Sequence, residues 1–478
     1  MEYGPVAIVV AHGMGQQIPF QTLDDVAEGL RRQDRKRRKN KPPMPIAKTV
    51  ELGGERLARL ELKLLTNEGE RDVHIYESYW APMTEGKVTL RDVMGFLLRG
   101  GLGGLRLTRR PLKRWLFGEY EKYPAPLLTV VWLALSMAVV VALTWLSVVI
   151  VVVAAAKVPL RDVSPWLTET RFRDITAVFN VHVSLMAPFV LLMLWWGLTR
   201  RRLPGWLSLG TFGLAVLSTL GSALLVALVA YYHTRGGDTG SFFERAGIPW
   251  LPGLFPTWFS NISWVLVVGA TALVRWFLIQ YVGDVAAYVQ PQVVDRFYEL
   301  RKEIKKSVWT TANAVYREEE YRDIIMVGHS LGSVVAYDVL NLLLTDHKLN
   351  PGTMPEVAGR TRLLLTFGSP LDKTAFIFAA QGTGTEAREA IAASFQPLIT
   401  EEEVRPRWVN IYSRWDIISG SLEYYDRKDR SNRNAVENIR DTKATTLLAA
   451  HVEYWRNDKL FETLVEALAP PPGQGATP

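Results

Sequence analysis

The stretch DIIMVGHSLGSVVAYDVL, residues 323–340, decides the fold, because it passes from a short apolar strand directly into an apolar helix with a serine at the corner. Its centre, GHSLG (328–332), has the G-x-S-x-G pattern of a sharp strand-to-helix turn that presents a serine hydroxyl. Gly328 and Gly332 stand where side chains would collide in so tight a turn. The start of the helix would favour a negative charge developing beside Ser330. The stretch therefore predicts a strand, a tight turn and a helix, with Ser330 as a candidate nucleophile.

Three further apolar runs resemble the strand before this serine. They are VAIVVAHG (6–13), LLLTFGSP (363–370) and WVNIYS (408–413). Apolar runs without alternation fit strands that are buried on both faces of a parallel sheet. Helical spacing of apolar residues lies between them, in 293–315 and 333–344, and the extended segments 56–65 and 73–83 are expected to form a strand pair. The pattern predicts an α/β protein with a mainly parallel sheet flanked by helices.

Polar or glycine-rich residues follow all four apolar runs. These are His12 with Gly13, Ser330, the segment 368–370 and Asp416. Open α/β sheets bind ligands beyond the carboxyl ends of their strands. We therefore expect a functional site at one edge of the sheet.

A serine nucleophile needs a general base and an acid that orients the base. Only two histidines follow Ser330, and His347 comes one helix length after the turn, which places it away from the sheet edge. His451, in LLAAHVEYW, is therefore the candidate base. Asp416 directly follows the fourth strand and is favoured as the acid, with Asp372 in FGSPLDK as the alternative.

An oxyanion would need two preorganised N–H donors. One candidate is the backbone amide of Leu331, the residue after the nucleophile. The other is the backbone amide of Met14, in the loop HGMG (12–15) that leaves the first strand, where His12 and Gly13 would support it.

Composition excludes several other chemistries. The chain has no cysteine, which rules out disulfides, thiolate metal sites and a cysteine nucleophile. No cluster has metal-ligand spacing and no dinucleotide motif is present, so we expect neither a metal nor a cofactor. The net charge of +7 is modest for 478 residues, and no nucleic-acid motif accompanies it.

The basic run RRQDRKRRKNK (31–41) is interpreted as a solvated surface, with contact to anionic lipid head groups as the alternative.

A different kind of segment occupies the middle of the chain. Four uncharged runs there each exceed the roughly 20 residues needed to cross a bilayer. The expected spans lie near 127–153, 176–199, 205–232 and 256–276. The chain is thus divided into an N-terminal part of the core (1–90), a membrane insertion (91–284), a C-terminal part of the core (285–468) and a disordered tail (469–478). The N-terminus has no signal-peptide pattern.

Basic residues near the span ends indicate the orientation. RLTRRPLKRW precedes the first span, TRRR joins the second to the third, and further Lys and Arg residues follow the fourth. Both termini and both parts of the core are therefore expected on the cytoplasmic side, with a residue near 240 on the opposite side.

With these motifs in place, the chain resembles the α/β-hydrolases of the lipase and esterase type. VVAHGMG, VGHSLGS, TFGSPLD, NIYSRWDIISG and HVEYW occur in the lipase-like order and span the whole core. The resemblance implies Ser330 as nucleophile, His451 as base and Asp416 as acid, with Met14 and Leu331 as oxyanion donors. The departure from the family is the large insertion between the early strands and the serine.

The expected function is hydrolysis of an ester or thioester in a lipid-like substrate by a membrane-bound serine hydrolase. The proximity of membrane segments is the reason for the choice of a lipid or acyl ester. The alternative is a catalytically silent hydrolase scaffold that binds a lipid or a protein partner.

Overall fold

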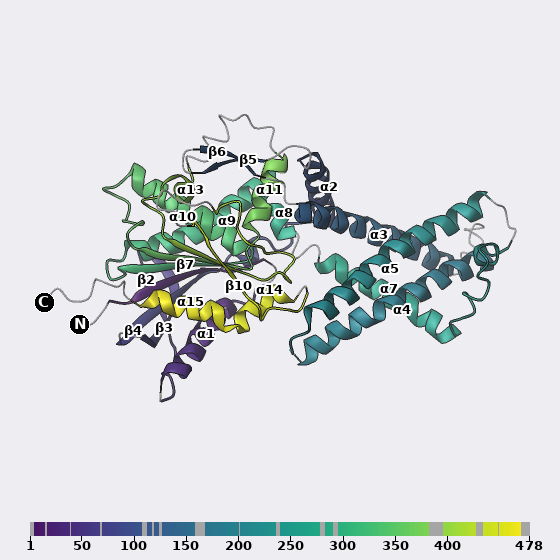
Figure 1. Ribbon diagram of the computed structural model, residues 1–478, viewed down its shortest axis with the longest axis horizontal. Coiled ribbons are helices and arrows are strands. Elements are labelled where there is room, and N and C mark those ends of the chain that lie inside the picture. Colours follow the sequence, from purple (N-terminus) through teal and green to yellow (C-terminus); the bar gives the residue numbers. More distant parts are fainter. Residues whose placement is uncertain are drawn as a thin grey trace. The chain divides into compact units, whose positions relative to one another are not determined.

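The computed structural model describes most of the chain. The described residues are 4–14, 17–38, 40–66, 69–107, 112–116, 119–123, 127–157, 168–199, 201–235, 240–277, 283–289, 295–381, 395–426, 434–447 and 449–469. The chain divides into two compact units, which we call the sheet unit (Met1–Thr129 with Gln280–Pro478) and the helical unit (Val130–Ile279). Each is described by itself (Figure 1). Apart from Ala469, the predicted disordered tail lies outside the described residues.

An eight-stranded mixed sheet forms the centre of the sheet unit, in the order β10-β9-β8-β7-β1-β4-β3-β2. In that order the strands are Glu437–Arg440, Arg407–Tyr412, Thr361–Phe367, Asp323–His329, Val6–Ala11, Gly69–Ser78, Glu55–Thr66 and Ile46–Leu52. The strands from β10 to β4 pair in parallel, whereas β3 is antiparallel to both β4 and β2. The α/β prediction is confirmed, since the four apolar runs are the neighbouring strands β9, β8, β7 and β1.

The two outermost strands were not expected from the sequence. β2 is mostly exposed and β10 is only four residues long, so neither contains a continuous apolar run. Edge strands that face water on one side commonly carry charged residues, which obscure the pattern of a strand. The predicted pair 56–65 and 73–83 overlaps β3 and β4, which are antiparallel neighbours, but β4 ends at Ser78 and Ala81–Met83 form a short 3-10 helix.

Helices cover both faces of the sheet (Figure 1). α1 (Gln21–Arg37) and α15 (Asp458–Leu468) pack on one face, and α9 (Asp295–Arg317) and α10 (Leu331–Leu349) on the other. The other described elements of this unit are η1 (Ala81–Met83), α2 (Leu90–Leu107), the hairpin β5 (Leu112–Leu116) and β6 (Glu119–Tyr123), α8 (Gly283–Val289), α11 (Leu371–Gln381), α13 (Pro397–Thr400), α14 (Ala450–Glu453) and η4 (Tyr454–Arg456).

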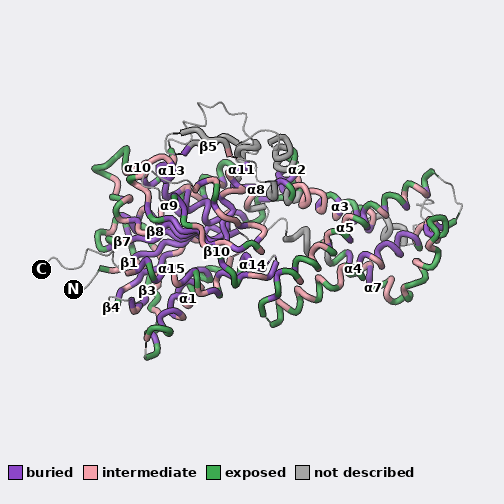
Figure 2. Tube along the Cα trace, viewed as in Figure 1, coloured by how far each residue is buried: buried purple, intermediate pink, exposed green. Residues whose placement is uncertain are grey.

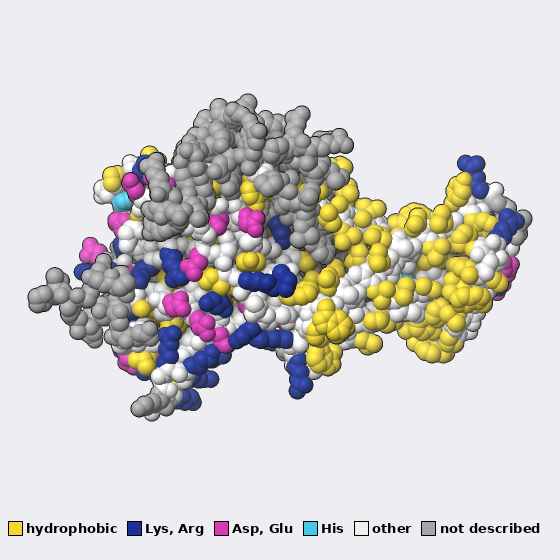
Figure 3. Space-filling view, in the orientation of Figure 1, with side chains coloured by type: hydrophobic (Ala, Val, Ile, Leu, Met, Phe, Trp, Pro, Cys, Tyr) yellow, Lys and Arg dark blue, Asp and Glu magenta, His cyan; other side chains and the backbone are white. Residues whose placement is uncertain are grey.

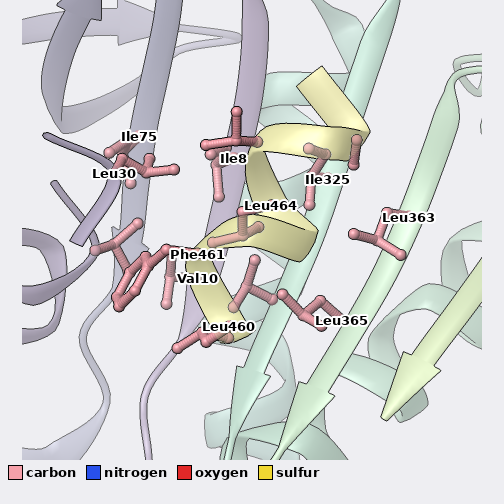
Figure 4. Packing of buried hydrophobic residues seen from close by; sticks show 14 of the residues in the cluster. Ile8, Val10, Leu30, Ile75, Ile325, Leu363, Leu365, Leu460, Phe461 and Leu464 are labelled. Carbon is pink, nitrogen blue, oxygen red and sulfur yellow. The ribbon is translucent and has the colours of Figure 1, made fainter. Parts of the chain in front are cut away.

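A hydrophobic core lies between the sheet and the α1–α15 layer. Figure 4 shows Leu460, Phe461 and Leu464 of α15 packed over side chains of β1, β7 and β8. β1 is buried along its whole length, and β7 is buried at every residue after the first (Figure 2). Each fully buried leucine or phenylalanine contributes about 1.5–3 kcal/mol of transfer free energy. The core therefore holds the carboxyl ends of β1, β7, β8 and β9 in a fixed register.

The helical unit contains the long helices α3 (Leu127–Lys157), α4 (Glu169–Thr199), α5 (Gly205–Arg235) and α7 (Thr257–Phe277), with the short α6 (Phe242–Arg245). α4 packs against α5 and α7. Buried polar side chains join these helices: Asn180 bonds to Ser260 and Ser263, and His182 Nδ1 lies 2.8 Å from Ser218 Oγ. Interhelical hydrogen bonds of this kind are common where helices associate in an apolar surrounding.

The outer surface of the helical unit is apolar. Large side chains such as Leu191, Leu217 and Val265 are 64–71% exposed. On the face drawn in Figure 3, hydrophobic side chains gather over this unit, whereas charged side chains gather over the sheet unit. Soluble monomers rarely expose apolar surface this extensively.

Two helices among the described residues, rather than the four expected, are long and apolar enough to span a membrane. These are α4 and α5, and only 28% and 39% of their apolar windows are buried, whereas a core helix would be mostly buried. The described apolar parts of the other two helices are shorter, Ala134–Ile150 and Thr257–Gly269. Within the described residues, therefore, two of the four expected spans are found, and those near 127–153 and 256–276 stay a prediction.

Candidate active site

The polar ends of the four central strands meet at one edge of the sheet. Ala11 of β1 pairs with Gly328 of β7, and His329 of β7 pairs with Phe367 of β8, which pairs in turn with Ile411 of β9. In-register parallel strands end together, so the residues that follow them share that edge. The structure thus brings together His12, Gly13, Ser330, Gly368 and Asp416.

Ser330 occupies a strained turn between β7 and α10. Its backbone has φ 54° and ψ −129°, a positive φ that is rare for a residue with a side chain and costs about 1–3 kcal/mol. A Cβ on Gly328 would lie 2.5 Å from Ser333 Cα, and one on Gly332 would lie 2.2 Å from the Ala11 carbonyl oxygen. Both glycines are therefore required by close backbone approach.

Replacement of Gly332 with alanine is expected to lower the free energy of unfolding by about 4 kcal/mol or more, because backbone carbonyls cannot move aside as a flexible side chain can. The thermal midpoint of the detergent-solubilised protein measures the loss. Gly352→Ala is the matched control, since nothing lies within 4 Å of a Cβ there. Equal midpoints for the two variants would contradict the tight packing of the turn.

His451 and Asp416 form a buried pair. His451 Nδ1 lies 2.9 Å from Asp416 Oδ2, and the Ile418 amide donates to Asp416 Oδ1 at 2.9 Å. Burial would raise the pKa of Asp416, but the charge and hydrogen bond of His451 outweigh it and hold the pKa well below its usual range. The alternative acid, Asp372, accepts instead from the Tyr424 amide at 3.0 Å. Of the two candidates, Asp416 is the one that contacts the imidazole.

The Phe367–Gly368 segment lies beside both Ser330 and His451. The Ser330 amide donates to the Phe367 carbonyl at 3.1 Å, and a Cβ on Gly368 would lie 3.2 Å from His451 Cε1. Ser330 is 1% exposed and His451 is 7% exposed. Within the described residues, neither Ser330 Oγ nor His451 Nε2 has a hydrogen-bond partner. Buried polar atoms are usually paired, so these two are exceptions that call for an explanation.

His12 orients the loop that carries Met14. Its Nδ1 lies 2.8 Å from the Gly13 carbonyl and its Nε2 accepts from the Trp80 amide at 2.9 Å. The Gly13–Met14 peptide is consequently held from its carbonyl side, which sets the direction of the Met14 N–H. Gln17 Nε2 donates to the Met14 carbonyl at 3.0 Å, and a Cβ on Gly13 would lie 3.0 Å from Ser330 Cβ.

Leu331 is the first residue of α10. The first amides of a helix have no intrahelical partner, so the Leu331 N–H is available to an anion beside Ser330. The predicted oxyanion donors therefore lie on the two segments that flank the serine.

Two side chains that contact Asp416 or the loop after it were missed in the sequence. Tyr454 O–H donates to Asp416 Oδ2 at 3.0 Å, and Lys373 Nζ donates to the carbonyls of Ile417 and Ser419. Burial lowers the pKa of Lys373 to about 8, although the nearby carboxylates oppose this. Tyr454 could have been suspected because it follows the candidate base by three residues and so shares its helical face. No sequence signal separates Lys373 from a surface lysine.

Two histidines of the site are held neutral. Burial lowers the pKa of His12 to about 4, and burial together with the charge of His451 lowers that of His329 to about 3. The unfolded chain therefore binds protons at higher pH than the folded protein does, and stability is complete above pH 6.5 and falls as pH drops toward 4.

Each of these histidines should contribute a loss of about 2 kcal/mol between pH 6.5 and 5, since one pKa unit corresponds to about 1.4 kcal/mol. Chemical unfolding of the full chain, followed by tryptophan fluorescence, measures this loss. His329→Gln cannot be protonated and should roughly halve it. A flat stability profile over this interval would contradict the burial of two neutral imidazoles.

The basic run 31–41 makes extensive contacts within the protein. Ion pairs join Arg31 to Glu28, Lys36 to Asp458, and Arg38 to Asp34 and Glu70. These pairs reduce the charge that the run presents to solvent. Contact with anionic lipid stays a prediction.

In the described part of the chain, no group of three His, Asp or Glu residues could hold a metal ion. His347 lies near the end of α10, away from the turn that carries the serine.

No protein-family model, curated protein or solved structure matches this chain.

Proposed function

We propose that this protein is a membrane-bound serine hydrolase that cleaves an ester or thioester bond, with the sheet unit as an α/β-hydrolase-like domain. The observation that carries the proposal is the buried His451–Asp416 pair beside a serine in a strained strand-to-helix turn, with Ser330 Oγ and His451 Nε2 both unpaired. The order Ser, Asp, His along the chain is also that of α/β-hydrolases.

The chemistry follows from the roles of these groups. His451 Nε2 accepts the proton of Ser330 Oγ as this oxygen attacks the carbonyl carbon, and Asp416 stabilises the imidazolium that forms. The amides of Met14 and Leu331 stabilise the oxyanion. His451 then gives the proton to the leaving oxygen or sulfur, and water, deprotonated by the same imidazole, releases the acid from the acyl-enzyme.

A lipid-like substrate is proposed because the same chain carries apolar helices with exposed leucines and valines.

The decisive experiment is labelling of the native protein, in membranes, by a fluorophosphonate, which reacts only with activated serines. We expect labelling that a long-chain ester suppresses in competition. A folded protein that resists the probe at every pH between 6 and 9 would favour a silent scaffold.

We further propose four spans, α3, α4, α5 and α7, with both parts of the sheet unit in the cytoplasm. Support comes from the helical lengths of α3 and α7 and from the arginines in the loop between α4 and α5. If α4 and α5 alone crossed the membrane, this loop would lie on the opposite side.

Because the chain has no cysteine, a single introduced cysteine gives a background-free topology test. With four spans, Ala246→Cys should react with a membrane-impermeant maleimide added from outside, and Arg201→Cys should not. Both positions are exposed in the structure. The reverse result would indicate two spans, and equal reaction of both variants would contradict the bilayer placement.

A further inference from the structure

His329, the residue before Ser330, is connected to the candidate base. Its Nε2 lies 3.0 Å from the backbone carbonyl of His451. A carbonyl can only accept, so Nε2 carries the proton and donates it. The ring also stacks on Phe367, with centroids 4.8 Å apart, and lies 5.0 Å from the ring of His451 and 5.3 Å from that of Trp455. This imidazole is buried on all sides and stays neutral at working pH.

The other side of the ring faces the oxyanion loop. A Cβ on Gly13 would lie 3.1 Å from His329 Nδ1 and 3.0 Å from Ser330 Cβ. One side chain therefore touches the segments that carry all three working parts: the turn of the nucleophile, the loop of Met14 and the short helix of the base.

The base is in need of such support. His451 lies in α14, a helix of only four residues, whose last carbonyls have no intrahelical partner. Asp416 holds the Nδ1 end of its imidazole, but this contact alone leaves the backbone free to shift. The hydrogen bond from His329 holds the backbone at a second point.

We propose that His329 is a positioning residue that fixes the backbone of His451 to the strand of the nucleophile, so that His451 Nε2 faces Ser330 Oγ. This inference rests on the proposed function for its catalytic meaning. Displacement of a reacting group by 1 Å can cost about 100-fold in rate, which sets the expected effect.

The test compares His329→Leu with His329→Gln in the full-length protein. Glutamine places an N–H donor close to the position of Nε2, whereas leucine removes the donor. The leucine variant should react with a fluorophosphonate about 10- to 100-fold more slowly, and the glutamine variant at close to the native rate. Hydrogen exchange of residues 449–455 should accelerate in the leucine variant alone.

His74→Leu is the matched control. This imidazole is also buried in the sheet, on β4, and lies 2.8 Å from Tyr321 O–H, but it precedes the catalytic edge by four residues. His74→Leu should lower the thermal midpoint without slowing the reaction with fluorophosphonate or altering hydrogen exchange at 449–455. The inference is overturned if leucine and glutamine behave alike, or if the control reproduces the effect. Absence of labelling in the native protein would sink the proposed function, while the exchange experiment would still decide the role of His329.

Discussion

Ser330→Ala is expected to abolish fluorophosphonate labelling and to lower ester hydrolysis by about 10⁴- to 10⁶-fold. The alanine methyl keeps the Cβ and the strained backbone of the turn, so packing around it should be unchanged. What is lost is the Oγ, on a side chain whose Cβ lies beside Gly13 at the sheet edge. The initial rate with a long-chain ester, at equal amounts of folded protein, measures the effect.

The control for this experiment is Ser333→Ala, three residues further along α10. Ser333 Oγ donates to the Gly328 carbonyl at 2.9 Å and has no role in the proposed chemistry. Ser333→Ala should lower the free energy of unfolding by about 1 kcal/mol and leave fluorophosphonate labelling intact. Residual hydrolysis of more than a few per cent in Ser330→Ala would show that another group performs the reaction.

Asp416→Asn is expected to lower the rate of hydrolysis by about 10⁴-fold while the fold is retained. The carboxylate accepts the Nδ1 proton of His451, which leaves Nε2 free to take the proton of Ser330. An asparagine amide can donate to Nδ1 instead, and the imidazole would then carry its proton on Nε2 and fail as a base. The effect should appear in kcat and much less in KM, because the acid does not touch the substrate.

Asp372→Asn separates the two candidate acids. Asp372 accepts from the Tyr424 amide and should support the loop rather than the base, so its variant should hydrolyse esters at close to the native rate. If Asp372→Asn lost hydrolysis and Asp416→Asn kept it, the acid would be assigned to Asp372. A similar loss in both would point to general damage of the loop that follows β9.

Much of the sheet unit could be predicted because its central strands are buried on both faces. Such strands are uniformly apolar, and the residues that end them stand out by contrast, as His12, Ser330 and Asp416 do. The edge strands β2 and β10 escaped prediction because exposure removes that signal. Of the four expected spans, α4 and α5 are long and apolar enough within the described residues, and the other two stay a prediction.

By itself, the sequence determined the α/β class, the strand-to-helix turn at Ser330 and the set of residues that gather at one edge, since all of these depend on local periodicity and chain order. Only the tertiary structure shows that Asp416 contacts the imidazole of His451 while Asp372 accepts from the Tyr424 amide, because both residues follow neighbouring strands in the sequence. The contacts of His329, Lys373 and Tyr454 likewise join segments far apart in the chain. Long-range hydrogen bonds depend on how the helices and loops pack against the sheet, and a single sequence has no local pattern that records them.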